Sequence, residues 1–102
     1  MRATKVKYTV QSVYAKRNAE NINDVVNEIK RLNTADIKYC TFLLDDKKSF
    51  VHFVMLKNEE ANHILTNLES FKKFRSELKD SNPEISPMVE NISLVCSSFT
   101  IF

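Results

Sequence analysis

The residues best suited to chemistry lie on a predicted β-hairpin that spans residues 37–56. His52 is inside the apolar second run of this hairpin, and a symmetric turn at residues 45–48 would place it opposite Thr41. Because side chains alternate along a strand, Tyr39 then shares the same face. An imidazole beside hydroxyl groups can move a proton or hold a polar group. His52 is therefore the candidate catalytic acid/base residue, with Tyr39 and Thr41 orienting a substrate.

Apolar side chains surround these polar groups on the same predicted face. Large apolar residues with a few converging polar groups are typical of a small-molecule pocket. From the residues alone, the candidate pocket comprises Tyr8, Tyr39, Thr41, Phe50, His52, Val54 and Leu56. The alternative, which the sequence leaves open, is that the histidine and the tyrosines are hydrogen-bonded residues of an ordinary core.

The remaining reactive side chains lack the spacing of a metal or nucleophile site. His63 lies beside the apolar stripe of a predicted helix, where a partly exposed histidine is expected, and no third ligand accompanies the two histidines. Cys40 and Cys96 lie in apolar runs without adjacent positive charge, so we expect buried, reduced thiols in a cytoplasmic protein. The chain has no glycine, which excludes phosphate loops and dinucleotide-binding turns. We expect no metal and no cofactor.

The composition argues against nucleic-acid and membrane partners. Fifteen basic and 13 acidic residues leave a net charge of +2, and no apolar stretch is long enough to cross a bilayer. RNA-recognition domains share the element order given below, but here Ser49 replaces their glycine and His52 occupies a base-stacking position. The basic residues of the late helical region are Lys72, Lys73, Arg75 and Lys79. Acidic residues are interspersed with them, which favours a solvated helix face.

Periodicity along the chain predicts the elements that would position these residues. Alternating apolar and polar residues predict strands at residues 5–14, 37–44, 49–56 and 91–101. Apolar residues three and four positions apart predict a helix at residues 18–33 and a second helix that begins after Asn58 and restarts at Ser70. Residues 81–88 contain both prolines and are typical of an irregular connection.

This βαββαβ order is the ferredoxin-like α+β plan, a four-stranded antiparallel sheet with two helices on one face. The 102 residues fit one domain that covers the whole chain. Two helices can cover only one face of the sheet, yet the third predicted strand is apolar on both faces. We therefore expect a homodimer whose sheets pack face to face through Val51, Phe53, Met55, Phe42 and Cys40.

Residues 53–74, FVMLKNEEANHILTNLESFKKF, resemble the signature segment of the antibiotic biosynthesis monooxygenase-like family in the dimeric α+β barrel superfamily. That pattern is a strand ending in Trp, an acidic helix start with Ala, His-Leu, and Phe-x-x-Phe. It fits here with Ala61, Phe71 and Phe74 in register. The resemblance implies a homodimer with a pocket between sheet and helices in each subunit. Some members are cofactor-independent oxygenases of polycyclic phenols or quinones, and others degrade haem.

The chain departs from this pattern at two functional positions. Leu56 stands at the family's tryptophan position and Leu65 at its histidine position, which adds Leu65 to the candidate pocket. His63 is two residues away, about 200° around the helix, so it cannot replace that histidine. Two leucines can contact a ligand, but they cannot hydrogen-bond, transfer a proton or bind iron.

The sequence therefore predicts a monooxygenase-like dimeric α+β barrel that binds a small apolar or aromatic molecule between sheet and helices. The first alternative is a cofactor-independent oxygenase that acts on a quinol- or phenol-type substrate through His52. The second alternative is a non-catalytic interaction module without a ligand. An open cavity with His52 at its wall would favour binding or catalysis, and a space filled by side chains would favour the interaction module.

Overall fold

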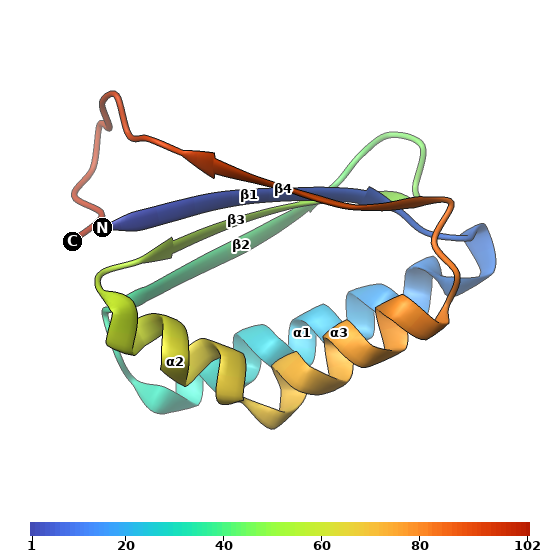
Figure 1. Ribbon diagram of the computed structural model, residues 1–102, viewed down its shortest axis with the longest axis horizontal. Coiled ribbons are helices and arrows are strands. Elements are labelled where there is room, and N and C mark those ends of the chain that lie inside the picture. The colour runs from blue at the N-terminus through green and yellow to red at the C-terminus, as the bar shows by residue number, and fades with distance from the viewer.

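The computed structural model describes residues 1–102 and contains a four-stranded sheet with three helices on one side of it (Figure 1). The strands are β1 (Arg2–Thr9), β2 (Ile37–Leu43), β3 (Ser49–Leu56) and β4 (Ile85–Ile92). The helices are α1 (Ala15–Leu32), α2 (Glu59–Asn67) and α3 (Glu69–Asp80). This order confirms the ferredoxin-like α+β fold, with the second predicted helix divided into α2 and α3.

The sheet is antiparallel throughout and has the strand order β2-β3-β1-β4. The predicted hairpin register is confirmed, because Thr41 lies opposite His52 and Tyr39 lies opposite Val54. On the other side of β3, Tyr8 of β1 lies opposite Phe50, which makes it a diagonal neighbour of His52 on the same face.

The side chain of Asp46 fixes the turn of this hairpin. Its Oδ1 accepts hydrogen bonds from the backbone N–H groups of Lys48 at 3.0 Å and Ser49 at 2.8 Å. Lys47 takes a left-handed conformation with φ of 65°, which closes the turn without a glycine. The turn is therefore specified locally, and with it the face on which His52 lies.

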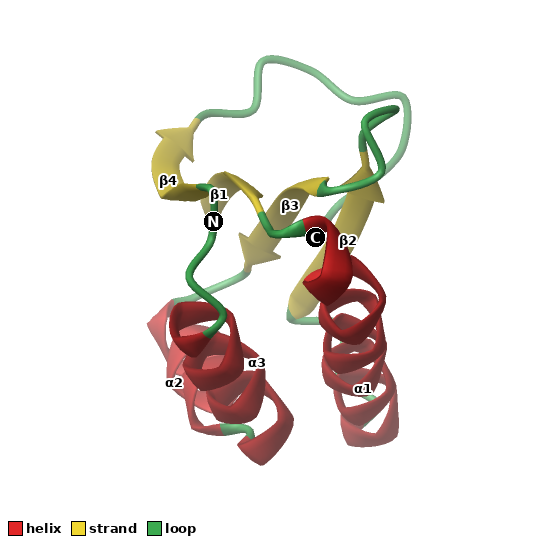
Figure 2. Cartoon of the chain, turned by 90° about the vertical axis from the view of Figure 1, so that its right-hand side faces the viewer, coloured by secondary structure: helices red, strands yellow, loops and turns green.

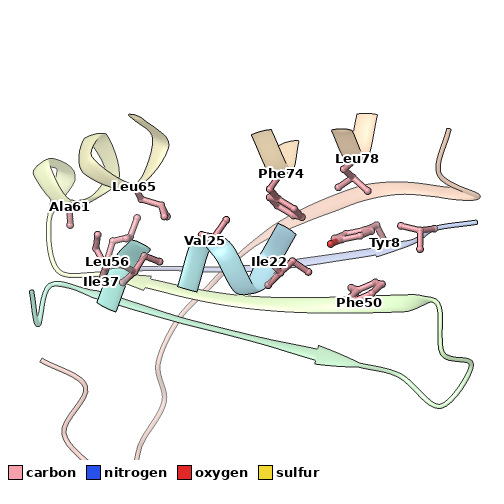
Figure 3. Close-up of a cluster of buried hydrophobic side chains, with 12 residues drawn as sticks. Tyr8, Ile22, Val25, Ile37, Phe50, Leu56, Ala61, Leu65, Phe74 and Leu78 are labelled. Atoms are coloured by element: carbon pink, nitrogen blue, oxygen red, sulfur yellow. The ribbon is translucent and has the colours of Figure 1, made fainter. Parts of the chain in front are cut away.

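The helices divide the sheet between them. Figure 2 shows α1 beneath the half of the sheet formed by β2 and β3, and α2 and α3 beneath the half formed by β1 and β4. Their apolar stripes meet the inner face of the sheet in one core (Figure 3), which comprises Tyr8, Val10, Ile22, Val25, Ile29, Ile37, Phe50, Leu56, Ala61, Leu65, Phe74 and Leu78. The other face of the sheet has no helix against it (Figure 1).

The first predicted strand is too long at its C-terminal end. β1 ends at Thr9, and Ser12–Tyr14 form a 3-10 turn that leads into α1. The backbone N–H of Val10 still bonds to the carbonyl of Lys48, but β3 begins at Ser49 and offers no partner beyond that point. The alternation of residues 10–14 therefore continues past the end of the hydrogen-bonded ladder.

The predicted fourth strand at residues 91–101 is wrong. β4 spans Ile85–Ile92, so half of the segment expected to be an irregular connection is strand, and residues 93–102 are not. The reason is the length of its partner, because Ile92 already lies opposite Ala3 near the start of β1. Pro87 is tolerated because β4 is an edge strand, where a missing N–H costs no ladder hydrogen bond.

The predicted helix start at Asn58 is confirmed. Its side-chain oxygen accepts a hydrogen bond from the Ala61 backbone N–H at 2.9 Å. The predicted restart near Ser70 corresponds to the break at Leu68, whose ψ of 133° is extended and ends α2. Glu28 of α1 provides an acceptor for a backbone N–H group in the first turn of α3. Its Oε1 accepts hydrogen bonds from the Ser70 N–H at 3.2 Å and from the Ser70 hydroxyl at 2.5 Å.

Two further expectations concern the surface. None of the helices combines the length and the apolar character needed to cross a membrane. The expected burial of the cysteines is wrong for the single chain, since both thiols are free and exposed. Cys40 points to the uncovered face of β2, and Cys96 lies beyond β4 in the segment expected to be strand.

Candidate functional site

His52 is the centre of a buried polar network on the helix-covered face of β3. Only 2% of its surface is exposed. Its Nε2 lies 2.7 Å from the Tyr8 hydroxyl oxygen. Its Nδ1 lies 2.8 Å from the Tyr39 hydroxyl and 3.1 Å from the Thr41 hydroxyl. Three predicted site residues from β1 and β2, Tyr8, Tyr39 and Thr41, thus surround the imidazole that β3 supplies.

Asn18 extends this network into α1. Its Nδ2 donates to the Tyr8 hydroxyl oxygen at 2.8 Å, which allows Tyr8 in turn to donate its own proton to His52 Nε2. In that tautomer, Nδ1 of His52 carries the ring proton and faces the hydroxyl oxygens of Tyr39 and Thr41. Both ring nitrogens then have a partner, and the Tyr39 hydroxyl keeps a proton that it can donate to a bound molecule.

The network is uncharged at neutral pH. Burial lowers the pKa of His52 to about 4, because the imidazolium loses its hydration in the core. Burial also raises the pKa values of the Tyr8 and Tyr39 hydroxyls above their ordinary values. The site can therefore accept and donate hydrogen bonds, but it offers no charge of its own to a ligand.

Aromatic rings enclose the imidazole on several sides. The Tyr8 ring is stacked on it with centroids 5.3 Å apart, and the Phe74 ring of α3 lies at 5.4 Å. The Tyr39 ring approaches edge-on at 5.6 Å. Phe71 continues the aromatic surface from Phe74 at 6.1 Å. These contacts hold the imidazole in one orientation and give the adjoining space apolar aromatic walls.

A pocket of about 1050 Å³ opens between the sheet and the helices α2 and α3. Its floor includes Val6 and Val54, and one side is formed by Pro87 and Val89 of β4. Six of the eight predicted pocket residues line it: Tyr8, Tyr39, His52, Val54, Leu56 and Leu65. The predicted catalytic residue, His52, is therefore in the pocket wall.

Thr41 and Phe50 lie outside this pocket. They border a separate hollow of about 290 Å³ between α1 and the β2 side of the sheet, together with Ile22 and Val26. The physical reason is that α1 covers that half of the sheet and separates it from the space under α2 and α3 (Figure 2). Thr41 nevertheless contributes indirectly, because it contacts the same ring nitrogen as Tyr39.

The sequence prediction missed two parts of this site. Asn18 was expected only as the first residue of the helix at residues 18–33, yet it is fully buried inside α1 and bonds to Tyr8. Its position four residues before Ile22 on the apolar stripe was a usable signal. The prediction also missed the β4 wall, Pro87 and Val89, because the strand was expected further along the chain. His63 is exposed and outside the pocket, and no cluster of three metal-ligating side chains occurs.

Comparison with known proteins finds relatives only through structure. No protein-family model and no curated protein matches the sequence. A crystal structure of an antibiotic biosynthesis monooxygenase superposes with a TM-score of 0.74 at 12% identity, covering 94% of this chain and 100% of that one. A candidate member from Bacteroides thetaiotaomicron gives 0.83 at 8% identity, covering 97% and 93%. One from Nitrosomonas europaea gives 0.76 at 13%, covering 94% and 100%.

This chain has the antibiotic biosynthesis monooxygenase fold. The expected resemblance is thereby confirmed over nearly the whole length at the level of architecture. Within this monooxygenase fold, Leu56 and Leu65 each retain only 3% exposure and line the pocket. The positions that the resemblance assigns to tryptophan and histidine are thus occupied by buried aliphatic groups, which leaves His52 and Tyr39 as the main polar groups of the deep wall.

Proposed function

We propose that the protein binds a small apolar or aromatic molecule in the pocket between its sheet and α2/α3. The observation that carries this proposal is the pocket itself, about 1050 Å³ in volume with an apolar floor beside His52. Ligand sites are typically mostly apolar, with a few polar groups that fix orientation. Tyr39 supplies such a group, because it lines the pocket and its hydroxyl lies 2.8 Å from His52 Nδ1. A space filled by side chains would have favoured the interaction module.

A bulky substitution on β4 tests this proposal. Val89 lines the pocket from an exposed edge strand, so Val89→Trp adds volume there with little risk to the core. Met88 lies opposite Lys7 on the other face of the same strand, and Met88→Trp is the matched control. The probe is 1-pyrenebutanol, a neutral aromatic alcohol, followed by fluorescence anisotropy.

We expect saturable binding to the wild type, a loss of affinity of more than about tenfold in Val89→Trp, and wild-type affinity in Met88→Trp. A wild-type protein that shows no saturable binding would contradict the proposal. So would equal binding by the wild type and Val89→Trp, because the probe would then occupy a different surface.

A cofactor-independent oxygenase that acts on a quinol or phenol is the second candidate. The observation in its favour is the hydrogen-bonded chain from Tyr39 through His52 to Tyr8, which borders the pocket and could pass a proton. Both ring nitrogens are already engaged, however, so binding without chemistry is better supported. Oxygen uptake with a naphthohydroquinone above the protein-free rate, lost in His52→Ala but kept in His63→Ala, would support catalysis. No uptake would remove this candidate.

We also propose a homodimer in which the uncovered sheet faces meet. The expected interface residues Val51, Phe53 and Met55 are only half-buried in the single chain, and Phe42 is 57% exposed. A surface patch of this kind is rare on a monomer unless it is a contact site. We further propose a cytoplasmic location, because free thiols such as the exposed Cys96 stay reduced there.

A further inference from the structure

The basic and the acidic residues of helix α3 lie mostly on different sides of the helix. Three basic residues, Lys72, Arg75 and Lys79, follow one another at spacings of three and four, so they form one row along the helix. All three line the pocket. The acidic residues of α3 are Glu69, Glu77 and Asp80. Because each residue is rotated by about 100° from the one before it, they lie on a different side of the helix, and none of them lines the pocket. The basic residues of α3 are exposed, as expected for a solvated helix face, and three of them form a cationic row at the pocket rim.

Two of these cations have no carboxylate partner. Arg75 and Lys79 form no ion pair within 4.0 Å, and the Arg75 guanidinium lies over the Phe71 ring, 5.7 Å from its centroid. Glu77 cannot neutralise them, because it faces α1 and accepts from Arg17 at 3.1 Å. Lys72 has only a long contact with Glu69 at 3.7 Å, between two exposed side chains. Positive charge therefore remains uncompensated beside an aromatic wall.

The rest of the pocket adds no negative charge. Its lining contains no aspartate or glutamate and one further cation, Arg2, which pairs with the exposed Glu59 at 3.7 Å. The nearby polar residues are neutral, among them Asn62, Thr66 and Asn82. The acidic residue of the following loop, Glu84, is turned away and held by Lys48 at 2.9 Å. An anion placed at Arg75 and Lys79 would therefore meet two cations without carboxylate partners, above a floor that is apolar.

We propose that the pocket selects an amphipathic anion, with an aromatic or aliphatic body between the Phe71–Phe74 wall and the sheet and a carboxylate at Arg75 and Lys79. This inference rests on the proposed binding function and narrows its ligand class. A planar guanidinium can hold a carboxylate through two parallel hydrogen bonds, and the Lys79 ammonium adds a second charge. The neutral His52–Tyr39 pair would contact the body of the ligand, away from the carboxylate.

Two probes that share one body isolate the charge. They are 1-pyrenebutyrate and the neutral 1-pyrenebutanol, compared by fluorescence anisotropy at low and at high salt. The test variant is Arg75→Gln/Lys79→Gln. The matched control is Arg31→Gln/Lys73→Gln, which removes the same two charges from positions that do not line the pocket. Circular dichroism confirms that each variant is folded.

We expect the wild type to prefer the butyrate, and the test variant to lose about tenfold in butyrate affinity while its alcohol affinity stays within about twofold. High salt should weaken only butyrate binding, because it screens exposed charges. The control variant should match the wild type for both probes.

Three results would overturn the inference. The first is equal wild-type affinity for the two probes, and the second is an equal loss of both in the test variant. The third is an equal loss of butyrate affinity in the test and control variants, which would indicate a general charge effect. In each of these cases the binding function survives. If neither probe binds the wild type, the proposed function fails as well.

Discussion

At the scale of single residues, the environment of His52 makes it neutral. The imidazole has three hydrogen-bond partners that need no charge, Tyr8, Tyr39 and Thr41, and no carboxylate contacts it. A protonated ring would be left in the core without a counter-ion, so burial lowers its pKa to about 4. The same arrangement suits a ligand site that must stay dry and uncharged behind a cationic rim.

This environment makes folding stability depend on pH. The folded-state pKa of His52 lies below its ordinary value of 6.5, so between these values the unfolded chain binds a proton that the folded chain does not. Stability is therefore full above pH 6.5 and is lost as the pH falls toward 4. We expect the free energy of unfolding to decrease by about 1.4 kcal/mol per pH unit in that window, measured by urea denaturation at fixed protein concentration.

Two variants test whether His52 is the source of this pH dependence. His52→Gln is expected to be less stable overall but to lose most of the slope between pH 6.5 and 5. The exposed His63 provides the control, since His63→Gln should keep the wild-type slope. A wild-type protein whose stability is flat across this window would show that the imidazole is not buried as the structure has it.

At the scale of elements, α2 depends on its first turn. The segment is only nine residues long, and isolated helices of that length are unstable in water. Asn58 satisfies the Ala61 N–H at its start, and Glu59 and Glu60 in the first turn suit the positive end of the helix dipole.

Asn58→Ala removes that cap without touching the core. We expect the free energy of unfolding to fall by about 1 kcal/mol, as for other caps of this type, measured by urea denaturation. Asn58→Asp keeps an accepting oxygen and should remain close to the wild type. An alanine variant as stable as the aspartate variant would mean that the cap contributes nothing.

How much of each element could be predicted depends on how local its determinants are. The β2–β3 hairpin was predicted in register because alternation and the turn at residues 45–48 specify it within one short stretch. The site residues His52, Tyr39 and Thr41 followed from that register. β4 was misplaced because its limits depend on β1, about 80 residues earlier, and the apolar tail with Leu94 alternates equally well.

Contacts between side chains of different elements could also not be predicted from the sequence. The contact between Asn18 and Tyr8, and the row of cations at the pocket rim, both require knowing how each helix is rotated about its axis against the sheet. Periodicity gives the direction of an apolar stripe but does not show which polar residue at its border turns inward. Such border residues, among them Asn18 and the cations of α3, form an important part of this site.

At the scale of the whole molecule, the single chain leaves an apolar surface without cover. The uncovered sheet face includes the Phe42–Phe53 pair, with ring centroids 6.1 Å apart, and the exposed Met88 of β4. The segment after β4 adds Val95 and Phe99, which are 94% and 69% exposed. A second copy could bury these groups together, and each buried apolar side chain would contribute on the order of 1–3 kcal/mol.

A charge placed on this face tests the dimer. We expect light scattering to report twice the 11.9 kDa chain mass for the wild type and a single chain mass for Phe53→Glu, because an unpaired carboxylate would be trapped between the sheets. Val13→Glu adds the same charge at a site that is 96% exposed and lies away from the sheet, so it should remain dimeric. Retained binding of 1-pyrenebutanol by Phe53→Glu would show that the pocket is complete within one chain, as its lining residues indicate. A wild type that stays at 11.9 kDa at its highest soluble concentration would rule the dimer out, and the apolar face would then need another partner.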